Sequence, residues 1–349
     1  LWLDEPGFPM EAEGALLDGL KGHVAWEPLP ALLDLTTEAL GKVLAHFVVR
    51  GELRLVTDLL QELDGLFTVL GEGVAATRET LQQLRSRLSE TSAFDAALRV
   101  LYALEAPDVP VMALPYFEAL GAPGAQALMG RLAEEPDRRR RGRLMELLRA
   151  MGDEAIPAIQ AALHHETWFV VRNALNLLAE LGHAGLVPDV ASCLRHGDPR
   201  VRQAAVRALW KLGGPAADGP LLELLPTTDP DTQMEVLFGL GQIQSPRASN
   251  TLLAFATDSR IQERLRVKAL EVVGVLGQPE SQGALAELLK RRGRIFTSAE
   301  PLPLRLAAAR ALLGLSLPQA TALVREVVAS EPRGADRDAL QALLGAATR

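Results

Sequence analysis

An apolar pattern recurs along this chain at a nearly constant interval, and it constrains the fold more than any other feature. In the segment that begins at Val170, further apolar residues stand four, seven, eight and eleven places later, which puts all of them on one face of a helix. Arg140 and Thr232 are the polar exceptions in the series. A period of about 31 residues predicts a solenoid whose repeats pack on their neighbours. The repeats begin at residues 109, 140, 170, 201, 232, 265 and 304.

The residues that follow the pattern predict a turn and a second helix in each repeat. Gly182 comes directly after the last apolar residue of its repeat, where a helix end favours a residue that can adopt left-handed backbone. Three places after the last apolar position, most repeats have a proline, which can begin a helix without losing an internal hydrogen bond. Each repeat is therefore predicted to be helix, glycine turn, helix. These prolines are Pro123, Pro215, Pro246, Pro279 and Pro318.

The repeats resemble HEAT repeats of the bacterial type, also known as HEAT-like or PBS-lyase-type repeats. The run Asp198-Pro199-Arg200-Val201-Arg202 with the apolar residues after it is similar to the first-helix motif of that family. The resemblance covers roughly residues 92–349 and implies an all-α, armadillo-like fold, an α-solenoid of about seven helix-turn-helix repeats with an N-terminal helical extension.

The family's arginine, one place after the first apolar position, is present in only some repeats. Arg172 is displaced by one place, and Gln233 and Pro110 replace the arginine in two others. We expect the arginines to fix one repeat against the next by hydrogen bonds to neighbouring carboxylates or carbonyls, rather than to bind a ligand. They are Arg141, Arg202, Arg266 and Arg305.

The regularity of the pattern divides the chain into three parts. Residues 1–30, with their prolines and aromatic residues, predict an extended arm or linker. Residues 31–105 predict irregular helical hairpins. Residues 106–349 predict the HEAT-repeat solenoid, closed by a capping helix over residues 335–347. The apolar stripe over residues 55–70 is broad enough to need cover from neighbouring helices or from another copy of the chain, so self-association through the N-terminal helices is an open alternative.

Charge and composition narrow the classes of partner. With 36 basic and 44 acidic residues the formal charge is −8, which argues against a surface that follows phosphates, so we do not expect nucleic acid as a partner. The single cysteine, Cys193, permits no internal disulfide and fits a reducing, cytoplasmic location. No apolar run of about 18 residues predicts a membrane span.

The histidines raise the hypothesis of a metal site, which their spacing disfavours. His164, His165 and His196 fall at the ends of second helices in successive repeats, and His183 lies in a turn at the opposite edge. Zinc needs its ligand atoms about 2 Å from one point. The paired His-Glu motifs with which deoxyhypusine hydroxylase holds iron are absent, and nothing specifies the pigment of the phycobilin lyases. We expect no metal and no cofactor.

Two aromatic residues depart from the repeat at positions that share a helix face. Trp210 stands nine places, and Phe238 six places, after the first apolar residue of adjacent repeats, where polar residues are common. One hypothesis is that they form an apolar patch that binds a protein partner; the other is that they cover each other or receive the N-terminal arm. Trp168 precedes its helix where other repeats have proline, so it is either a hydrophobic staple at the start of the helix or a contact for a partner.

Two positively charged segments are further candidates. The longest interval between repeats places an inserted loop near residues 290–298, where Arg292, Arg294 and Phe296 could bind a partner, although insertions are also tolerated without function. The arginines at 138–141 and 143 are expected to be a solvated helix end with acidic neighbours at 134 and 135. Binding of an anion or an acidic protein is the alternative.

The sequence therefore favours a non-catalytic scaffold or adaptor that binds another protein through an extended surface, or that forms one module of a larger polypeptide. An accessory or catalytic protein of the HEAT-like lyase type is the alternative, and a nucleic-acid-binding HEAT protein is a third. No nucleophile–base pair or glycine-rich phosphate loop supports catalysis. The identity of the partner does not follow from the sequence.

Overall fold

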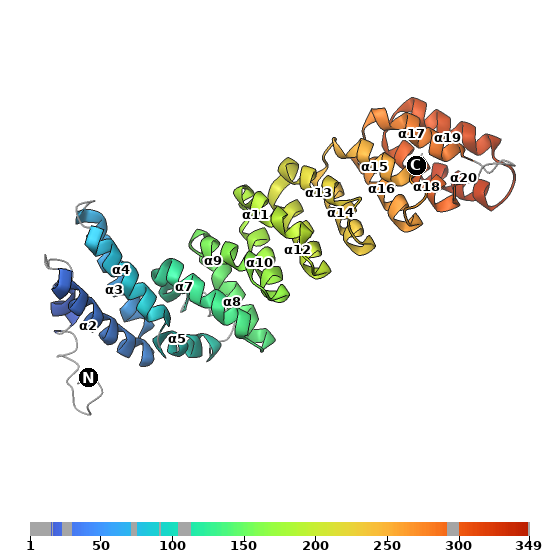
Figure 1. The fold of residues 1–349 in the computed structure, drawn as a ribbon. Helices are drawn as coiled ribbons and strands as arrows, with labels where there is room; N and C mark the ends of the chain where they lie inside the picture. Colours follow the sequence, from blue (N-terminus) through green and yellow to red (C-terminus); the bar gives the residue numbers. More distant parts are fainter. Residues whose placement is uncertain are drawn as a thin grey trace. The chain divides into compact units, whose positions relative to one another are not determined.

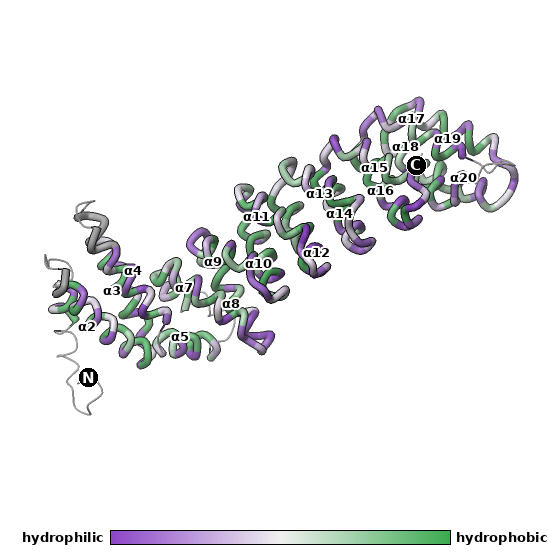
Figure 2. Tube along the Cα trace, in the orientation of Figure 1, coloured by the Kyte–Doolittle hydropathy of each residue, from purple (hydrophilic) through white to green (hydrophobic). Residues whose placement is uncertain are grey.

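The computed structural model describes residues 15, 17–22, 30–70, 75–90, 92–103, 113–291 and 300–347. All regular secondary structure in these residues is helical, as the repeat pattern predicts (Figure 1). Hydrophobic and hydrophilic residues alternate along the tubes of the helices (Figure 2), as expected of helices that bury one face. The chain forms two compact units, residues 1–177 and residues 178–349, and each is described by itself.

The first unit is built from long helices in its N-terminal half and from short pairs after them. Two of the long helices, α3 and α4, pack directly against α7, and α2 packs on α4. The helices are α2 (Pro30–Val49), α3 (Leu53–Leu70), α4 (Ala75–Glu90), α5 (Ser92–Ala103), α7 (Leu114–Glu134), α8 (Arg138–Ala150), the 3-10 turn η1 (Gly152–Ala155), α9 (Ile156–Ala161), η2 (Ala162–His164) and α10 (Trp168–Leu181), which continues into the second unit.

The broad apolar stripe of α3 is covered within the chain over its first half. Val56, Leu60 and Leu63 are buried against the neighbouring helices, whereas Leu55 is partly exposed. The side chains of residues 66–70 lie outside the described residues. Self-association through these helices therefore stays a prediction.

Part of the arm predicted over residues 1–30 is helical rather than extended. Residues 17–22 form a helical segment in which Leu17 is buried and Lys21 donates hydrogen bonds to both carboxylate oxygens of Glu62 on α3, at 2.8 and 2.9 Å. Burial of an apolar side chain together with an ion pair to α3 fixes this stretch in a way that its glycines and prolines did not indicate. The division of the chain into an arm, hairpins and a solenoid stays a prediction.

The second unit consists of helix pairs in which the first helices pack on one another in the order α12, α14, α16, α18, and each second helix packs on the first helix of the next repeat. The elements are η3 (Ala184–Leu186), α11 (Val187–Ser192), η4 (Cys193–Arg195), α12 (Pro199–Gly213), η5 (Gly214–Ala217), α13 (Asp218–Leu224), α14 (Pro230–Ile243), α15 (Ala248–Thr257), α16 (Glu263–Leu276), η6 (Pro279–Ser281), α17 (Gln282–Lys290), α18 (Leu302–Gly314), α19 (Pro318–Ser330) and α20 (Ala335–Ala347).

The turn between the two helices of a repeat uses left-handed backbone, but not always a glycine. Gln244 and Ser316 adopt φ angles of 54° and 55° directly after the last apolar position. The predicted turn is therefore correct in its backbone conformation, but the residue in it is not always glycine. The short connection between the two helices needs a positive φ, even where a side chain makes that conformation costly. Glycine takes the corresponding position at Gly121, Gly152, Gly182 and Gly277.

The arginines one place after the first apolar position act as the sequence predicts, linking neighbouring repeats. Arg266 donates to the carbonyl oxygen of Ala256 in the preceding second helix at 2.7 Å and to the Glu300 carboxylate at 2.7 Å. Arg305 donates to the carbonyl of Leu289 at 3.1 Å and to the Glu331 carboxylate at 2.7 Å. Each arginine therefore satisfies a helix-end carbonyl and pairs with a carboxylate further along the chain.

Arg202 makes the same type of link between α12 and α14, and Gln233 makes only half of it. Arg202 donates to the carbonyls of His196 and Gly197 and to the carboxylate of Asp229, the N-cap of α14. Gln233 donates to the carbonyl of Leu225 at 2.9 Å, but it has no charge with which to bind a carboxylate. At Gln233 the link therefore lacks the ion pair that Arg202 and Arg266 form.

The first helices approach one another closely where glycine replaces a side chain. A Cβ atom at Gly274 of α16 would lie 2.9 Å from the Cα of Ala311 on α18, closer than real Cβ atoms pack. A Cβ at Gly241 of α14 would lie 3.5 Å from the Val272 side chain, an ordinary contact. The α16–α18 contact therefore requires glycine, whereas the α14–α16 contact at Gly241 does not.

Candidate functional site

The two aromatic residues singled out from adjacent repeats lie in contact on the first-helix side of the second unit. Trp210 of α12 and Phe238 of α14 pack edge to face, with their ring centroids 5.8 Å apart and their planes at 79°. Phe238 remains 43% exposed, and Trp210 is half-buried. We call this pair the aromatic patch. Each ring covers part of the other and restricts its rotation, and part of the pair remains exposed to solvent.

Gly239 creates the space in which the Trp210 side chain lies. A Cβ atom at this position would come within 3.2 Å of Cδ1 of the indole. The residue stands at an apolar position of the helix pattern, and sequence reasoning did not connect it with Trp210. The sequence did contain a signal for this contact. Glycine in the interior of a helix lowers the stability of the helix, so a glycine at a buried position suggests that a neighbouring side chain packs closely against it.

Charged side chains border the aromatic patch. Arg207, one turn before Trp210, donates to the Glu235 carboxylate at 2.9 Å, one turn before Phe238. The ammonium group of Lys211 lies 5.9 Å from the centroid of the Trp210 ring. The patch thus has a neutral ion pair along one side and a cation beside the indole, an arrangement similar to the polar rim of a protein interface.

One polar atom of the patch is unsatisfied. The indole Nε1 of Trp210 is buried and has no hydrogen-bond partner among the described residues. A buried donor without an acceptor typically costs about 1–3 kcal/mol. No hydrogen bond of the indole therefore holds the Trp210 ring in place, and its position rests on its contacts with Phe238 and with the backbone near Gly239.

Trp168 does not precede its helix as expected; it is the first residue of α10. Its ring packs at 90° to that of Phe169, with centroids 6.0 Å apart, and the Arg172 guanidinium lies 5.1 Å from its centroid. This stacking on Trp168 gives Arg172 a partner in place of the inter-repeat link made by the regular arginines. Trp168 belongs to the first unit, and it is not part of the aromatic patch.

The candidate loop residues Arg292, Arg294 and Phe296 lie outside the described residues. The base of their loop is described. Glu300 donates its backbone N–H to the carbonyl of Arg291 at 3.3 Å, and the Arg291 guanidinium lies 3.4 Å from the Glu300 carboxylate. The loop is therefore closed at its base by the same carboxylate that binds the inter-repeat arginine of α16.

Two of the histidines, His165 and His196, form hydrogen bonds with nearby backbone, and the cysteine is buried. The Nδ1 atoms of His165 and His196 each accept a hydrogen bond at 3.0 Å from a backbone N–H two residues later, Thr167 and Asp198 respectively. Cys193 is buried, and burial raises the pKa of its thiol. In the described part of the chain, no group of three or more His, Cys, Asp or Glu side chains is placed to hold a metal ion.

Among the helices that the structure describes, none is both long and apolar enough to cross a membrane.

Comparison with known families identifies the repeats. A family model described as HEAT repeats matches residues 156–232, which confirms the predicted HEAT repeats over this segment. No curated protein sequence matches the chain.

Solved structures of repeat proteins are similar at low identity. Importin beta is 11% identical, with 99% of this chain and 57% of that chain covered at a TM-score of 0.45. Human deoxyhypusine hydroxylase in complex with glycerol is 20% identical over 76% of this chain and 98% of that one, with a TM-score of 0.30. The CpcE–CpcF complex of phycocyanin lyase from a Nostoc species is 18% identical over 72% and 94%, with a TM-score of 0.30.

Proposed function

We propose that this chain is a non-catalytic scaffold that binds another protein, and that the aromatic patch of Trp210 and Phe238 contacts that partner. The observation that carries the proposal is the exposure of a phenylalanine fixed in orientation by an edge-to-face tryptophan. Tryptophan and other large side chains near the centre of an interface often dominate its binding energy. A stack of HEAT repeats supplies the rigid surface on which such residues can be displayed.

The surroundings of the patch support a partner contact rather than a purely structural role. Phe238 could be replaced by a polar residue without opening the core, because its side chain lies on the surface. Its ring is nonetheless held by Trp210, so little side-chain entropy is lost when a partner covers it. The Arg207–Glu235 pair lies along one edge and satisfies its own charges, so apolar contact with the patch does not strand either charge.

The test is affinity capture from a cell lysate with the intact chain and two variants. The first variant, Trp210→Ala with Phe238→Ala, removes the patch. The matched control, Leu35→Ala, removes a side chain that is 64% exposed on α2 of the other unit. We expect at least one protein to be retained by the wild type and the control but lost by the double variant. Equal retention by all three would exclude the patch as the binding site.

A second variant separates the role of the ring from that of the fold. Trp210→Phe keeps an aromatic ring beside Phe238 and removes the unsatisfied indole donor, so we expect the free energy of unfolding to stay equal or to rise by up to about 1 kcal/mol. If the proposal is right, partner binding falls in this variant although stability does not. A parallel loss of stability and binding would assign Trp210 to the core.

Two further expectations stay with the proposal. The cytoplasmic location rests on the single reduced cysteine and can be checked by fractionation of the source cells. Self-association would be detected as a concentration-dependent mass in analytical ultracentrifugation, and a Leu55→Ser variant, which changes a partly exposed side chain of α3, would weaken it.

A further inference from the structure

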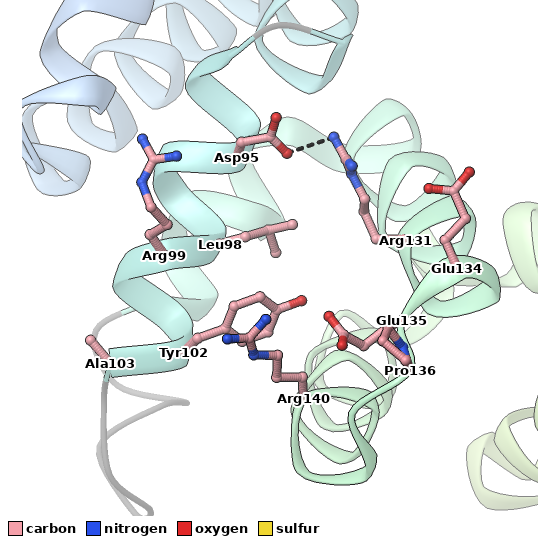
Figure 3. A pocket seen from close by; sticks show the side chains of 10 residues that line it. All are labelled: Asp95, Leu98, Arg99, Tyr102, Ala103, Arg131, Glu134, Glu135, Pro136 and Arg140. Carbon is pink, nitrogen blue, oxygen red and sulfur yellow. Dashed lines mark ion pairs between the residues drawn. The ribbon is translucent and has the colours of Figure 1, made fainter.

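A cavity of about 570 Å³ lies in the first unit, between α5, the end of α7 and the start of α8. Leu98 and Tyr102 of α5 form its apolar wall, and the ion pair between Asp95 and Arg131 joins α5 to α7 at its edge (Figure 3). Its volume falls within the range of about 300–1,000 Å³ that is typical of ligand pockets. The cavity is therefore large enough to accept a side chain together with part of the backbone that carries it.

Hydrogen bonds fix the walls of this cavity in place. Arg143 of α8 donates to the carbonyl of Leu101 at 2.6 Å, which ties α8 to α5. Arg141 donates to the carbonyls of Glu135 and Pro136 at 2.9 and 2.6 Å, which holds the connection from α7 to α8. Because hydrogen bonds to backbone carbonyls join α8 to α5 and hold the connection from α7 to α8, the cavity is preformed rather than assembled on binding.

The polar groups inside the cavity are already oriented. The Arg140 guanidinium lies over the ring of Tyr102, 4.9 Å from its centroid (Figure 3). Burial, with the charge of Glu135 and a hydrogen bond to it, raises the pKa of Tyr102 to about 12, so the phenol stays neutral and donates to that carboxylate. Glu135 also accepts the backbone N–H of Asp137 at 2.9 Å. Arg140 thus presents its unused N–H donors from a fixed position.

The charged side chains that line the cavity are balanced in number, with three arginines, Arg99, Arg131 and Arg140, and three carboxylates, Asp95, Glu134 and Glu135. Two of these carboxylates are engaged within the chain: Asp95 by Arg131, and Glu135 by two hydrogen bonds. In the described part of the chain, no ion pair engages the exposed arginines of this region, and these are Arg99, Arg138, Arg139 and Arg140.

We propose that this cavity binds an acidic peptide segment of another protein. One apolar side chain of the peptide lies against Leu98 and Tyr102, and flanking carboxylates bind the guanidinium groups of Arg99, Arg131 and Arg140. Guanidinium groups bind carboxylates through two parallel hydrogen bonds, which gives both affinity and orientation. This inference goes beyond the aromatic patch, because it concerns a different unit and a partner of stated chemistry.

An acidic peptide fits the cavity better than a nucleic acid does. Single-stranded nucleic acids bind where bases stack on exposed aromatic faces along a basic groove. Here Arg140 covers a face of Tyr102, so no stacking platform is open on that side. An apolar wall with arginines at its rim suits a side chain flanked by carboxylates.

The experiment measures fluorescence anisotropy of a labelled nonapeptide, four glutamates on each side of one leucine, titrated with the intact chain at low salt. We expect saturable binding, a loss of about tenfold or more in affinity for Arg140→Gln and for Arg131→Gln, and no change for Arg54→Gln, an exposed arginine of α3 in the same unit. A peptide with serine in place of leucine should bind more weakly, because it leaves the apolar wall uncovered.

Three outcomes would overturn the proposal. These are no saturable binding, equal loss in Arg54→Gln and Arg140→Gln, and equal binding of the leucine and serine peptides, which would reduce the effect to unspecific attraction. Binding of a single-stranded RNA oligomer that is tighter than that of the peptide and lost in Arg140→Gln would assign the site to nucleic acid instead. Circular dichroism of each variant confirms that the helices are retained, and failure at the aromatic patch would leave these results unchanged.

Discussion

Two links of the second unit use the same sequence position in different environments. Between α12 and α14, the side chains of Arg202 and Asp229 are 19% and 33% exposed. Near the end of the unit, those of Arg305 and Glu331 are only 4% and 6% exposed, and Arg305 also binds Asp336 of α20. The Arg202–Asp229 link is thus partly exposed to solvent. The Arg305–Glu331 link is buried and contacts the capping helix α20, and we call it the sealed link.

The difference in exposure between the two ion pairs indicates where this unit can lose a charged side chain at little cost in stability. An exposed ion pair contributes little, because solvent screens it and compensates when it breaks. A buried pair adds little net stability when intact, but the loss of one partner strands the other charge away from water. The aromatic patch lies on the same two helices as the more exposed link, α12 and α14. The sealed link supports the end of the stack.

The largest expected effect comes from breaking the sealed link. Glu331→Gln removes the charge that faces Arg305, and we expect the free energy of unfolding to fall by about 3 kcal/mol. The matched change Glu235→Gln, in the partly exposed pair with Arg207, should lower it by less than about 0.5 kcal/mol. Urea unfolding followed by circular dichroism measures both. Equal losses would mean that burial does not distinguish the Arg305–Glu331 pair from the Arg207–Glu235 pair.

A second comparison concerns the close approach of the first helices. Gly274→Ala places a Cβ atom 2.9 Å from backbone of α18, and we expect a loss of about 2 kcal/mol from overpacking. Gly241→Ala meets only an ordinary contact at 3.5 Å and should raise stability by up to about 1 kcal/mol, because alanine is the better helix former. A gain in both variants would show that α16 and α18 can move apart without cost.

The contribution of the Arg202–Asp229 link to stability should depend on pH. Burial raises the pKa of Asp229, but hydrogen bonds from Arg202 and Thr232 and the charge of Arg202 outweigh it and hold the pKa well below its usual range. Because the folded pKa is depressed, the contribution of Asp229 is fully present above the unfolded pKa of about 3.9 and is lost as pH falls through the folded pKa. Asp229→Asn should therefore cost about 1 kcal/mol near pH 7, since asparagine keeps the helix cap but not the charge.

Unfolding of the wild type and Asp229→Asn over a pH series checks this sign. The gap between them should narrow steadily below about pH 4. A gap that is constant down to about pH 2 would mean that the charge of Asp229 contributes nothing to the link.

The sequence predicted the parts of this structure that repeat and missed those that depend on a single neighbour. Apolar spacing located the helices, and the arginine position predicted the inter-repeat hydrogen bonds, because both follow from the geometry of a stacked repeat. It also brought Trp210 and Phe238 together, since their offsets share a face. Their role in binding stays a prediction.

The features that the sequence did not predict depend on contacts between individual side chains, which do not recur from repeat to repeat. The room that Gly239 makes for Trp210 follows from the distance between two helices, which the sequence does not give. The stacking of Arg140 on Tyr102 joins residues far apart in the pattern. The helical segment at residues 17–22 is fixed by a side chain of α3, not by its own composition.

The smallest expected effect would come from repairing the interrupted link. Gln233 holds the arginine position of α14, and Gln262, the N-cap of α16, stands where α14 has Asp229. Gln233→Arg alone buries a charge without a carboxylate and should destabilise the chain, whereas Gln262→Asp supplies a side-chain cap that α16 lacks. In the double variant the two new side chains should pair as Arg202 and Asp229 do. A double-mutant cycle in urea should then give a favourable coupling of about 0.5 kcal/mol, and a coupling of zero would mean that the α14–α16 spacing does not admit the pair.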